Sequence, residues 1–431
     1  MLIGQLHATD VRRVQRARLA TAVIFFAHGA VFGNWVSRVP AIKEHVHAGT
    51  GPLGLALLGI AVGALAARQV AGQLVARYGS RSVTRAGLAL CCLTLLLPAL
   101  AASAVVLGLA LAGFGAALGG ADVAMNAHAV AVQERVGRPI MSSFHGVYSV
   151  GGLAGALAGG RAAAANLGPL PHFSLVALVF LALVLAASSW LLPSARDTAP
   201  GSPSTGSTSK DSRSKGSTST GGWARLPADC RLTLVLLGLV GLGAMAGEGA
   251  AGDWGAIYLH DNLGASSGFA ASGFAAYCLA MAAGRFLGDA FVARWGGLRV
   301  VRWSLTFAGG GFAAALVIGN PVVAVGGFAT LGIGLALVIP VVFSIAGRLA
   351  GASVAPLAGE PAGPLGGEPA GPAITIVSSL SGLGAVAAPP IIGFLAELVG
   401  LPAALGAVSV LALLAAWLVR VVGSLQKSIS Y

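Results

Sequence analysis

The chain has 431 residues, of which 56% are apolar and only 9% are charged. Soluble globular proteins carry about 25% charged residues, so this composition excludes a soluble domain and predicts a chain whose solvent is a lipid bilayer. The formal net charge of +12 does not predict binding to nucleic acid, because the basic residues are distributed as expected for the loops of a membrane protein. The four cysteines show neither metal-ligand nor disulfide spacing.

Twelve apolar segments are long enough to cross a bilayer, which takes about 20 residues per helix. All of them must be helical, because hydrocarbon offers no hydrogen-bond partner to a free backbone group. The predicted helices cover residues 19–37, 53–76, 86–103, 105–132, 140–165, 172–192, 231–258, 267–292, 300–318, 321–347, 374–398 and 401–422. The sequence therefore predicts an all-α membrane protein with twelve transmembrane helices.

A Gly/Ser/Thr-rich stretch between the sixth and seventh predicted helices divides the chain into two halves. It buries too little apolar surface to fold, so we interpret it as a flexible cytoplasmic linker. A second polar stretch, at 355–372, predicts a loop between helices 10 and 11. The predicted organisation is a cytoplasmic segment 1–18, a six-helix bundle 19–193, the linker 194–230, a second six-helix bundle 231–423 and a cytoplasmic tail 424–431.

Basic residues gather on one face of this predicted topology. Only Arg38, Lys43 and Arg161 fall in segments on the other face. Lys and Arg are enriched in cytoplasmic loops, so we predict that both termini are cytoplasmic and that the chain is a multi-pass protein of a bacterial inner (plasma) membrane. The first apolar stretch lacks a small-residue cleavage site, and we interpret it as a retained signal anchor.

The two halves of the sequence look duplicated. Residues 66–85 align with residues 283–302 at a constant offset of 217. The alignment pairs Arg68, Arg77, Gly79 and Arg85 with Arg285, Arg294, Gly296 and Arg302. Each of these segments closes the second helix of its half and opens the third, which indicates two parallel six-helix repeats.

At the loop between helices 2 and 3 the chain resembles the major facilitator superfamily. Gly72, Arg77, Gly79 and Arg81 match the family pattern Gly-x-x-x-Asp-Arg-x-Gly-x-Arg, whereas an alanine replaces the aspartate. In the family this acid helps to latch the cytoplasmic side. Asp289 in the second copy is a candidate for a similar role.

Four further strings look like one bacterial branch of that superfamily, similar to the fucose permease-like carriers. They are NWVSRVPAIKEHV at 34–46, DVAMNAHAVAVQ at 122–133, SSFHGVYSVGGLAG at 142–155 and EGAAGDW at 248–254. This resemblance implies proton-coupled uptake of a small polar solute, such as a sugar.

Three acids lie within predicted helices, where an ionisable residue costs about 2.5–3.5 kcal/mol on insertion scales. All three are candidates for proton coupling. Glu248, beyond the middle of helix 7, is the first candidate for a proton carrier; the alternative is a structural carboxylate between helices. Asp253 is a candidate for substrate or gating contact. Asp122 shares a helix face with Asn126, which suits either a substrate path or a brace that holds Arg68.

Polar and aromatic side chains within the helices are candidates for contact with a polar solute in a central cavity: His28, Asn34, Trp35, Asn126, His145, Tyr148 and Trp254. Asn34 and Trp35 align with Asp253 and Trp254 at an offset of 219, as expected if the repeats present equivalent surfaces to one cavity. The competing interpretation is that the tryptophans anchor helix ends at the membrane interface and that the histidines bond only to neighbouring helices.

Arg68 and Arg285 occupy equivalent places on helices 2 and 8. Their side chains either extend to the lipid headgroups or form ion pairs that break and reform during transport, for example Arg285 with Asp289. The candidate gating residues are Arg68, Gly72, Arg77, Gly79, Arg81, Arg285, Asp289 and Arg294.

The sequence contains no nucleotide-binding, hydrolase or metalloprotease motif, so we expect no enzyme, no metal and no cofactor other than a coupling proton. We predict a monomeric carrier that works by alternating access, with the bilayer and a small-molecule substrate as its partners. Gly151, Gly155 and Gly159 resemble an efflux-associated pattern, so proton-linked efflux is the alternative. A membrane solute receptor that does not transport is the alternative from another class.

Overall fold

The computed structural model describes residues 2–193, 228–352 and 370–429. The first half consists of α1 (Leu2–Val36), α2 (Val39–His45), α3 (Thr50–Tyr78), α4 (Ser80–Thr94) with a 3-10 turn η1 (Leu97–Leu100), α5 (Ala104–Val136), α6 (Met141–Ala164) and α7 (Pro169–Ser188). Most of the predicted linker and of the polar stretch 355–372 lies outside the described residues.

The second half begins with a long interrupted helix made of α9 (Ala228–Gly249), the π-helical turn η3 (Ala250–Trp254), α10 (Gly255–Ile257) and a second π-helical turn η4 (Tyr258–Asn262). It continues with α11 (Ser267–Ala270), α12 (Ser272–Trp295), α13 (Gly297–Ile318), α14 (Pro321–Leu335), α15 (Val338–Ala352), α16 (Ala370–Val399) and α17 (Leu401–Ile429). π-Helical turns are rare and occur frequently at functional sites.

The prediction of an all-α membrane fold is confirmed. Among the described residues, eleven helices are long and apolar enough to cross a membrane, which is consistent with the predicted twelve. Helix α6 is the predicted fifth crossing, and it carries Ser142, Ser143 and His145 together with many glycines. Its 24 residues extend about 36 Å at 1.5 Å per residue, which is enough to span the hydrocarbon core.

Several predicted boundaries differ from those in the structure. Helix α1 already begins at Leu2, α9 includes Cys230 of the predicted linker, and α17 extends to Ile429 through the predicted tail. Helices continue beyond the bilayer because hydropathy marks only the part that lies in lipid. Predicted helix 10 is broken between α14 and α15, because Pro340 cannot donate a backbone hydrogen bond and its ring clashes with the carbonyl four residues earlier.

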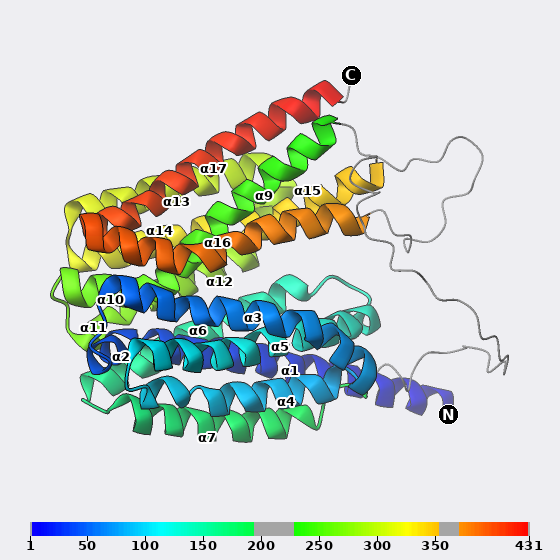
Figure 1. The fold of residues 1–431 in the computed structure, drawn as a ribbon. Helices are drawn as coiled ribbons and strands as arrows, with labels where there is room; N and C mark the ends of the chain where they lie inside the picture. The colour runs from blue at the N-terminus through cyan, green and yellow to red at the C-terminus, as the bar shows by residue number, and fades with distance from the viewer. Residues whose placement is uncertain (1, 194–227, 353–369, 430–431) are drawn as a thin grey trace, which may run out of the picture.

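The two halves form two bundles that lie one above the other in Figure 1, with both chain ends on the same side of the molecule. Helix α6 packs against α12 and α3 packs against α16, so these pairs join the halves. We call the side that carries the chain ends the terminal end. The opposite side, where α2 lies against α10, is called the closed end.

Helices α3 and α16 pack closely at the closed end. There Gly54 lies against Pro389 and Gly393 of α16. Towards the terminal end, the places where a Cβ of Gly72 and Gly382 would lie have no neighbour within 4 Å. Helices α9 and α17 of the second bundle also diverge from the first bundle in that direction (Figure 1).

The backbone confirms the internal duplication. Gly79 joins α3 to α4 with φ 80° and ψ 151°, and Gly296 joins α12 to α13 with φ 81° and ψ 144°. Only glycine adopts this region readily, since it has no Cβ to clash with its own backbone. The N-caps Ser103 of α5 and Asn320 of α14 are also separated by the same offset of 217.

Candidate functional site

The ionisable and aromatic side chains near the middle of the molecule come from α1, α5 and α6 of the first half and from α9 and α12 of the second. The link between the halves is made by Arg285 of α12. Its Nη1 donates to the backbone oxygen of His145 at 3.1 Å and to Ser149 Oγ at 2.9 Å, both on α6. The Arg285 side chain therefore does not extend to the lipid headgroups, which was one of its two predicted arrangements. The suggested pair with Asp289 is not seen either, since no ion pair joins these two described residues.

Asp122 forms the brace that was one of its two predicted roles. Arg68 Nη2 on α3 lies 3.2 Å from Asp122 Oδ2 on α5, and Asn126 Nδ2 donates to Asp122 Oδ1 at 3.0 Å. The Arg68 side chain is 52% exposed and that of Asp122 is 33% exposed. This ion pair neutralises both charges within the first half and still leaves them within reach of water.

His28, His145 and Tyr148 lie together between α1 and α6. His28 is buried, with Nε2 at 3.3 Å from the backbone oxygen of Leu118, and its ring centre lies 5.6 Å from that of Tyr148. His145 packs edge-on against Phe25. Tyr148 and His145 are half-buried, so the structure brings three of the predicted substrate-cavity residues into one cluster.

Glu248 faces this cluster from the second half. It is half-buried in the last turn of α9, directly before the π-helical turn. Its carboxylate acts electrostatically on the hydroxyl groups of Tyr148 and Tyr277. Within the described chain no hydrogen bond or ion pair holds Glu248, and the same is true of half-buried Asp253 in the π-helical turn η3.

Tyr277 of α12 belongs to the same cluster and was not among the sequence candidates. Its side chain is 3% exposed and its hydroxyl group is buried without a hydrogen-bond partner in the structure. The signal was present, because a tyrosine in the middle of a predicted helix carries a polar atom into the membrane. That signal is weaker than the charges of the acids.

Asn34, Trp35 and Trp254 lie apart from this cluster. Asn34 is 1% exposed and accepts a hydrogen bond from His172 Nε2 at 3.0 Å within the first half. Both tryptophans are completely buried, Trp35 against Phe114 and Trp254 near the junction of α3 and α16. Neither tryptophan therefore extends to a membrane interface in this structure, and the cavity role of these three residues stays a prediction.

The closed end carries polar contacts between the halves. Lys43 of α2 forms an ion pair with Asp261 of η4, which also lies 2.8 Å from His260 Nδ1. The backbone N–H of Gly51 donates to Glu397 Oε1 at 2.9 Å. These contacts were not predicted, since nothing in the sequence places residues so far apart next to each other.

The terminal end carries the family motif residues. Arg81 donates to the backbone oxygen of Ser189 at 3.3 Å. Arg77 lies over the ring of Tyr78, and Arg294 lies over the ring of Trp295, at equivalent positions of the two repeats. These contacts stay within one half, so the gating role of this motif stays a prediction.

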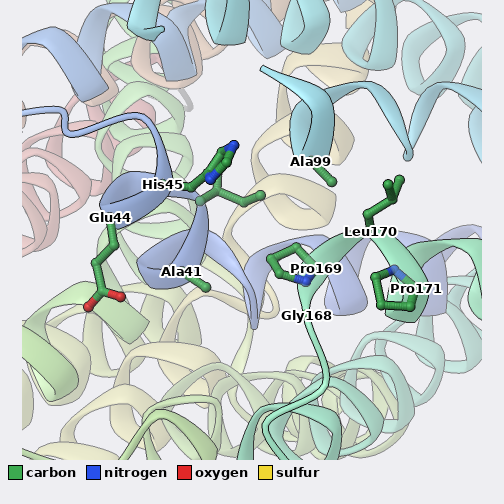
Figure 2. A pocket seen from close by; sticks show the side chains of 9 residues that line it. Ala41, Glu44, His45, Ala99, Gly168, Pro169, Leu170 and Pro171 are labelled. Atoms are coloured by element: carbon green, nitrogen blue, oxygen red, sulfur yellow. The ribbon is translucent and has the colours of Figure 1, made fainter. Parts of the chain in front are cut away.

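A cavity of about 530 Å³ lies at the closed end of the first half, between α2, η1 and the start of α7. Figure 2 shows that Glu44 and His45 point to opposite sides of α2, whereas Ala41, Ala99 and Pro169 offer only apolar surface. The polar groups therefore do not converge on one ligand. This cavity is also separate from the central cluster of Tyr148, Glu248 and Tyr277.

Twelve crossing helices in two repeated halves, which meet around half-buried ionisable side chains, define a polytopic membrane transporter. A family model of the Major Facilitator Superfamily matches residues 20–359. The chain belongs to this superfamily of transporters, and it is not an enzyme.

The relatives agree with this assignment. An uncharacterized MFS-type transporter of Yersinia pestis is 31% identical over 97% of this chain and 99% of its own length. An uncharacterized transporter of Sinorhizobium fredii is 32% identical over 80% of this chain and 85% of its own length.

Two solved transporters are similar in structure. A mutant of the nucleoside transporter NupG has a TM-score of 0.71 and 12% identity, with 94% of this chain and 99% of that one covered. A bacterial homolog of the human lysosomal transporter Spinster has a TM-score of 0.68 and 14% identity, with 96% and 97% covered. At these identities the likeness establishes the fold alone.

Proposed function

We propose that this chain is a proton-coupled uptake carrier for a small polar solute in the bacterial plasma membrane, working as a monomer by alternating access. The observation that carries the proposal is the half-buried cluster of Tyr148, Glu248 and Arg285 between the two halves. Secondary transporters of this architecture bind substrate and coupling ion between their repeats.

The sidedness of the proposal rests on charge. Basic loop residues lie mainly at the terminal end, including Arg81, Arg85 and Arg299, and this distribution favours a cytoplasmic terminal end. The contacts between Lys43 and Asp261 and between Gly51 and Glu397 then close the outer side. With this proposed orientation, the structure represents a carrier that is closed towards the outside.

Glu248 is the proposed proton carrier. Asp122 already shares its charge with Arg68, whereas Glu248 has no partner among the described residues and lies beside two tyrosine hydroxyls. A carboxylate without an ion-pair partner is free to gain and lose a proton as its access to water alternates. Asp253 is the second candidate, because it too lacks a partner in the described chain.

Efflux has less support than uptake. The efflux-like glycines of α6 face α1, where a Cβ at Gly151 would lie 2.1 Å from the backbone oxygen of Phe26 and a Cβ at Gly155 would lie 2.2 Å from that of Ala30. Close helix packing accounts for this spacing. Nothing in the comparisons supports the receptor alternative, since the relatives and structural neighbours described above are transporters.

The test begins with a thermal-stability screen of the detergent-purified chain against sugars, sugar acids, nucleosides, amino acids and lipophilic cations, because a bound ligand raises the unfolding temperature. The ligand found is then followed in proteoliposomes with an imposed pH gradient. We expect Glu248→Gln to retain exchange of substrate but to lose uphill accumulation. Asp253→Asn tests the second candidate in the same assay, and we expect it to retain uphill accumulation. Undiminished accumulation by Glu248→Gln excludes Glu248 as the proton carrier, and a ligand set limited to lipophilic cations favours efflux.

A further inference from the structure

Equivalent arginines of the two repeats have different partners. Arg68 on α3 is paired with Asp122 on α5. Arg285 occupies the same place on α12 at the offset of 217, and no described carboxylate lies within 4.0 Å of its guanidinium nitrogens. One arginine is therefore neutralised inside the protein and its counterpart is not.

The internal alignment explains the difference. The start of α5 at Ala104 corresponds to the start of α14 at Pro321 at the same offset, and the single helix α5 of the first repeat is matched by α14 and α15 of the second. The position equivalent to Asp122 is Ile339. The second repeat thus retains the cation and carries an apolar residue where the first has its acid.

The partners of Arg285 are both neutral. It donates to one backbone oxygen and to Ser149 Oγ, although a guanidinium group offers five N–H donors. A half-buried charge without a counter-charge is unfavourable, and Arg is the side chain best suited to hold a carboxylate or phosphate in two parallel hydrogen bonds. Glu248 lies in the same cluster but forms no ion pair with Arg285, so no described carboxylate occupies the remaining donors of Arg285.

Polar groups for the rest of a ligand lie next to Arg285. The hydroxyl of Tyr277 is buried without a partner, and the charges of both Glu248 and Arg285 act on it and on the hydroxyl of Tyr148. An unpartnered buried hydroxyl beside an unpaired cation matches a solute that carries both an anionic group and hydrogen-bonding groups.

We propose that the substrate is a small organic anion whose carboxylate or phosphate group binds Arg285, while its polar body bonds to Tyr277 and Tyr148. This inference rests on the proposed transport function and narrows its substrate class. Asp122 already shares its charge with Arg68, so protonation of Glu248 removes the described negative charge near the cluster that has no ion-pair partner and opposes the anion. Proton and substrate therefore bind together, and both leave when Glu248 is ionised again.

The test compares matched solutes that differ in one charged group: glucuronate with glucose, glucose 6-phosphate with glucose, and nicotinate with nicotinamide. The detergent-purified full chain is titrated with each at constant ionic strength, and the unfolding temperature is recorded. We expect at least one acid to raise the unfolding temperature saturably while its neutral partner does not. Comparison of the carboxylates with the phosphate shows which anionic group the site binds.

Three variants show whether Arg285 binds an anion or only holds α12 against α6 through its hydrogen bonds to His145 and Ser149. Arg285→Gln is expected to weaken binding of the acid by about 10- to 100-fold, the effect of losing hydrogen bonds to a charged group, and Arg285→Lys to recover part of it. Ser149→Ala removes one hydrogen-bond acceptor of Arg285 and leaves the guanidinium charge. The acid should therefore still raise the unfolding temperature of this variant. A ligand-free unfolding curve of each variant controls for folding.

Two results overturn the inference: stabilisation by a neutral solute that survives Arg285→Gln, or no Arg285-dependent stabilisation by any acid of the panel. Failure of proton coupling is recognised separately. If Glu248→Gln still accumulates substrate while acids bind through Arg285, the coupling proposal is wrong and the substrate class stands.

Discussion

The contact of Gly54 with α16 permits a sharp test of the closed end. A Cβ at position 54 would lie 2.6 Å from the backbone oxygen of Pro389 and 3.2 Å from the Cα atoms of Pro390 and Gly393. These are backbone atoms or the rigid ring of a proline, so no side-chain rotation relieves the overlap. Gly54→Ala therefore acts against the state in which α3 and α16 touch.

Overpacking of a close contact costs about 1–3 kcal/mol. If the two halves separate at this end in the other transport state, the penalty falls on the closed state alone, and the ratio of open to closed molecules rises about 5- to 150-fold. Gly72→Ala is the matched control. It lies on the same helix with no neighbour within 4 Å of the added Cβ, so it changes helix propensity in the same way without adding a clash.

The assay measures distances between spin labels at the closed end by double electron–electron resonance. Exposed His45 on α2 and Leu398 on α16, each replaced by cysteine, carry the labels, and the four native cysteines are buried. We expect Gly54→Ala to add a longer distance that the unsubstituted chain and Gly72→Ala lack. Identical distance distributions in all three chains refute the reasoning.

Two further predictions concern single contacts. Charge reversal at Lys43 is expected to raise the ratio of open to closed molecules up to about fivefold, the modest effect of a partly exposed pair. Simultaneous charge reversal at Asp261 is expected to restore the original ratio, and spin-label distances that do not return with the second reversal contradict this prediction. Asn34→Leu leaves His172 without its acceptor and is expected to lower the free energy of unfolding by about 1–3 kcal/mol, measured as thermal unfolding of the purified protein, whereas an unchanged unfolding temperature would show that the buried bond contributes nothing.

The path of the helices was predictable because the bilayer leaves few choices. Backbone groups in lipid must bond within their own helix, so hydropathy alone located the crossings. Even α6, whose polar residues weaken the apolar signal, was placed correctly because its neighbours leave no other course for the chain. The interruption of the helix before Val338 was not predicted, since a single proline does not always end a helix.

Contacts within one half were partly predictable. The pair of Arg68 and Asp122 was one of two readings of the sequence, and the structure forms it. The contacts of Asn34 with His172 and of Trp35 with Phe114 could not be predicted, because a helix that is apolar on nearly every side gives no signal of which side faces the centre.

The sequence by itself determined the membrane class, the helix count and the duplication, because these depend on hydropathy and on spacing along the chain. Only the tertiary structure decided which polar groups meet. Arg68 and Arg285 are equivalent in sequence, yet one lies against a carboxylate and the other against a backbone oxygen and a hydroxyl of the opposite half. The internal alignment shows that the second repeat has Ile339 where the first has its acid. Which groups of the opposite half Arg285 meets instead depends on how helices from distant parts of the chain pack, and no local pattern encodes that packing.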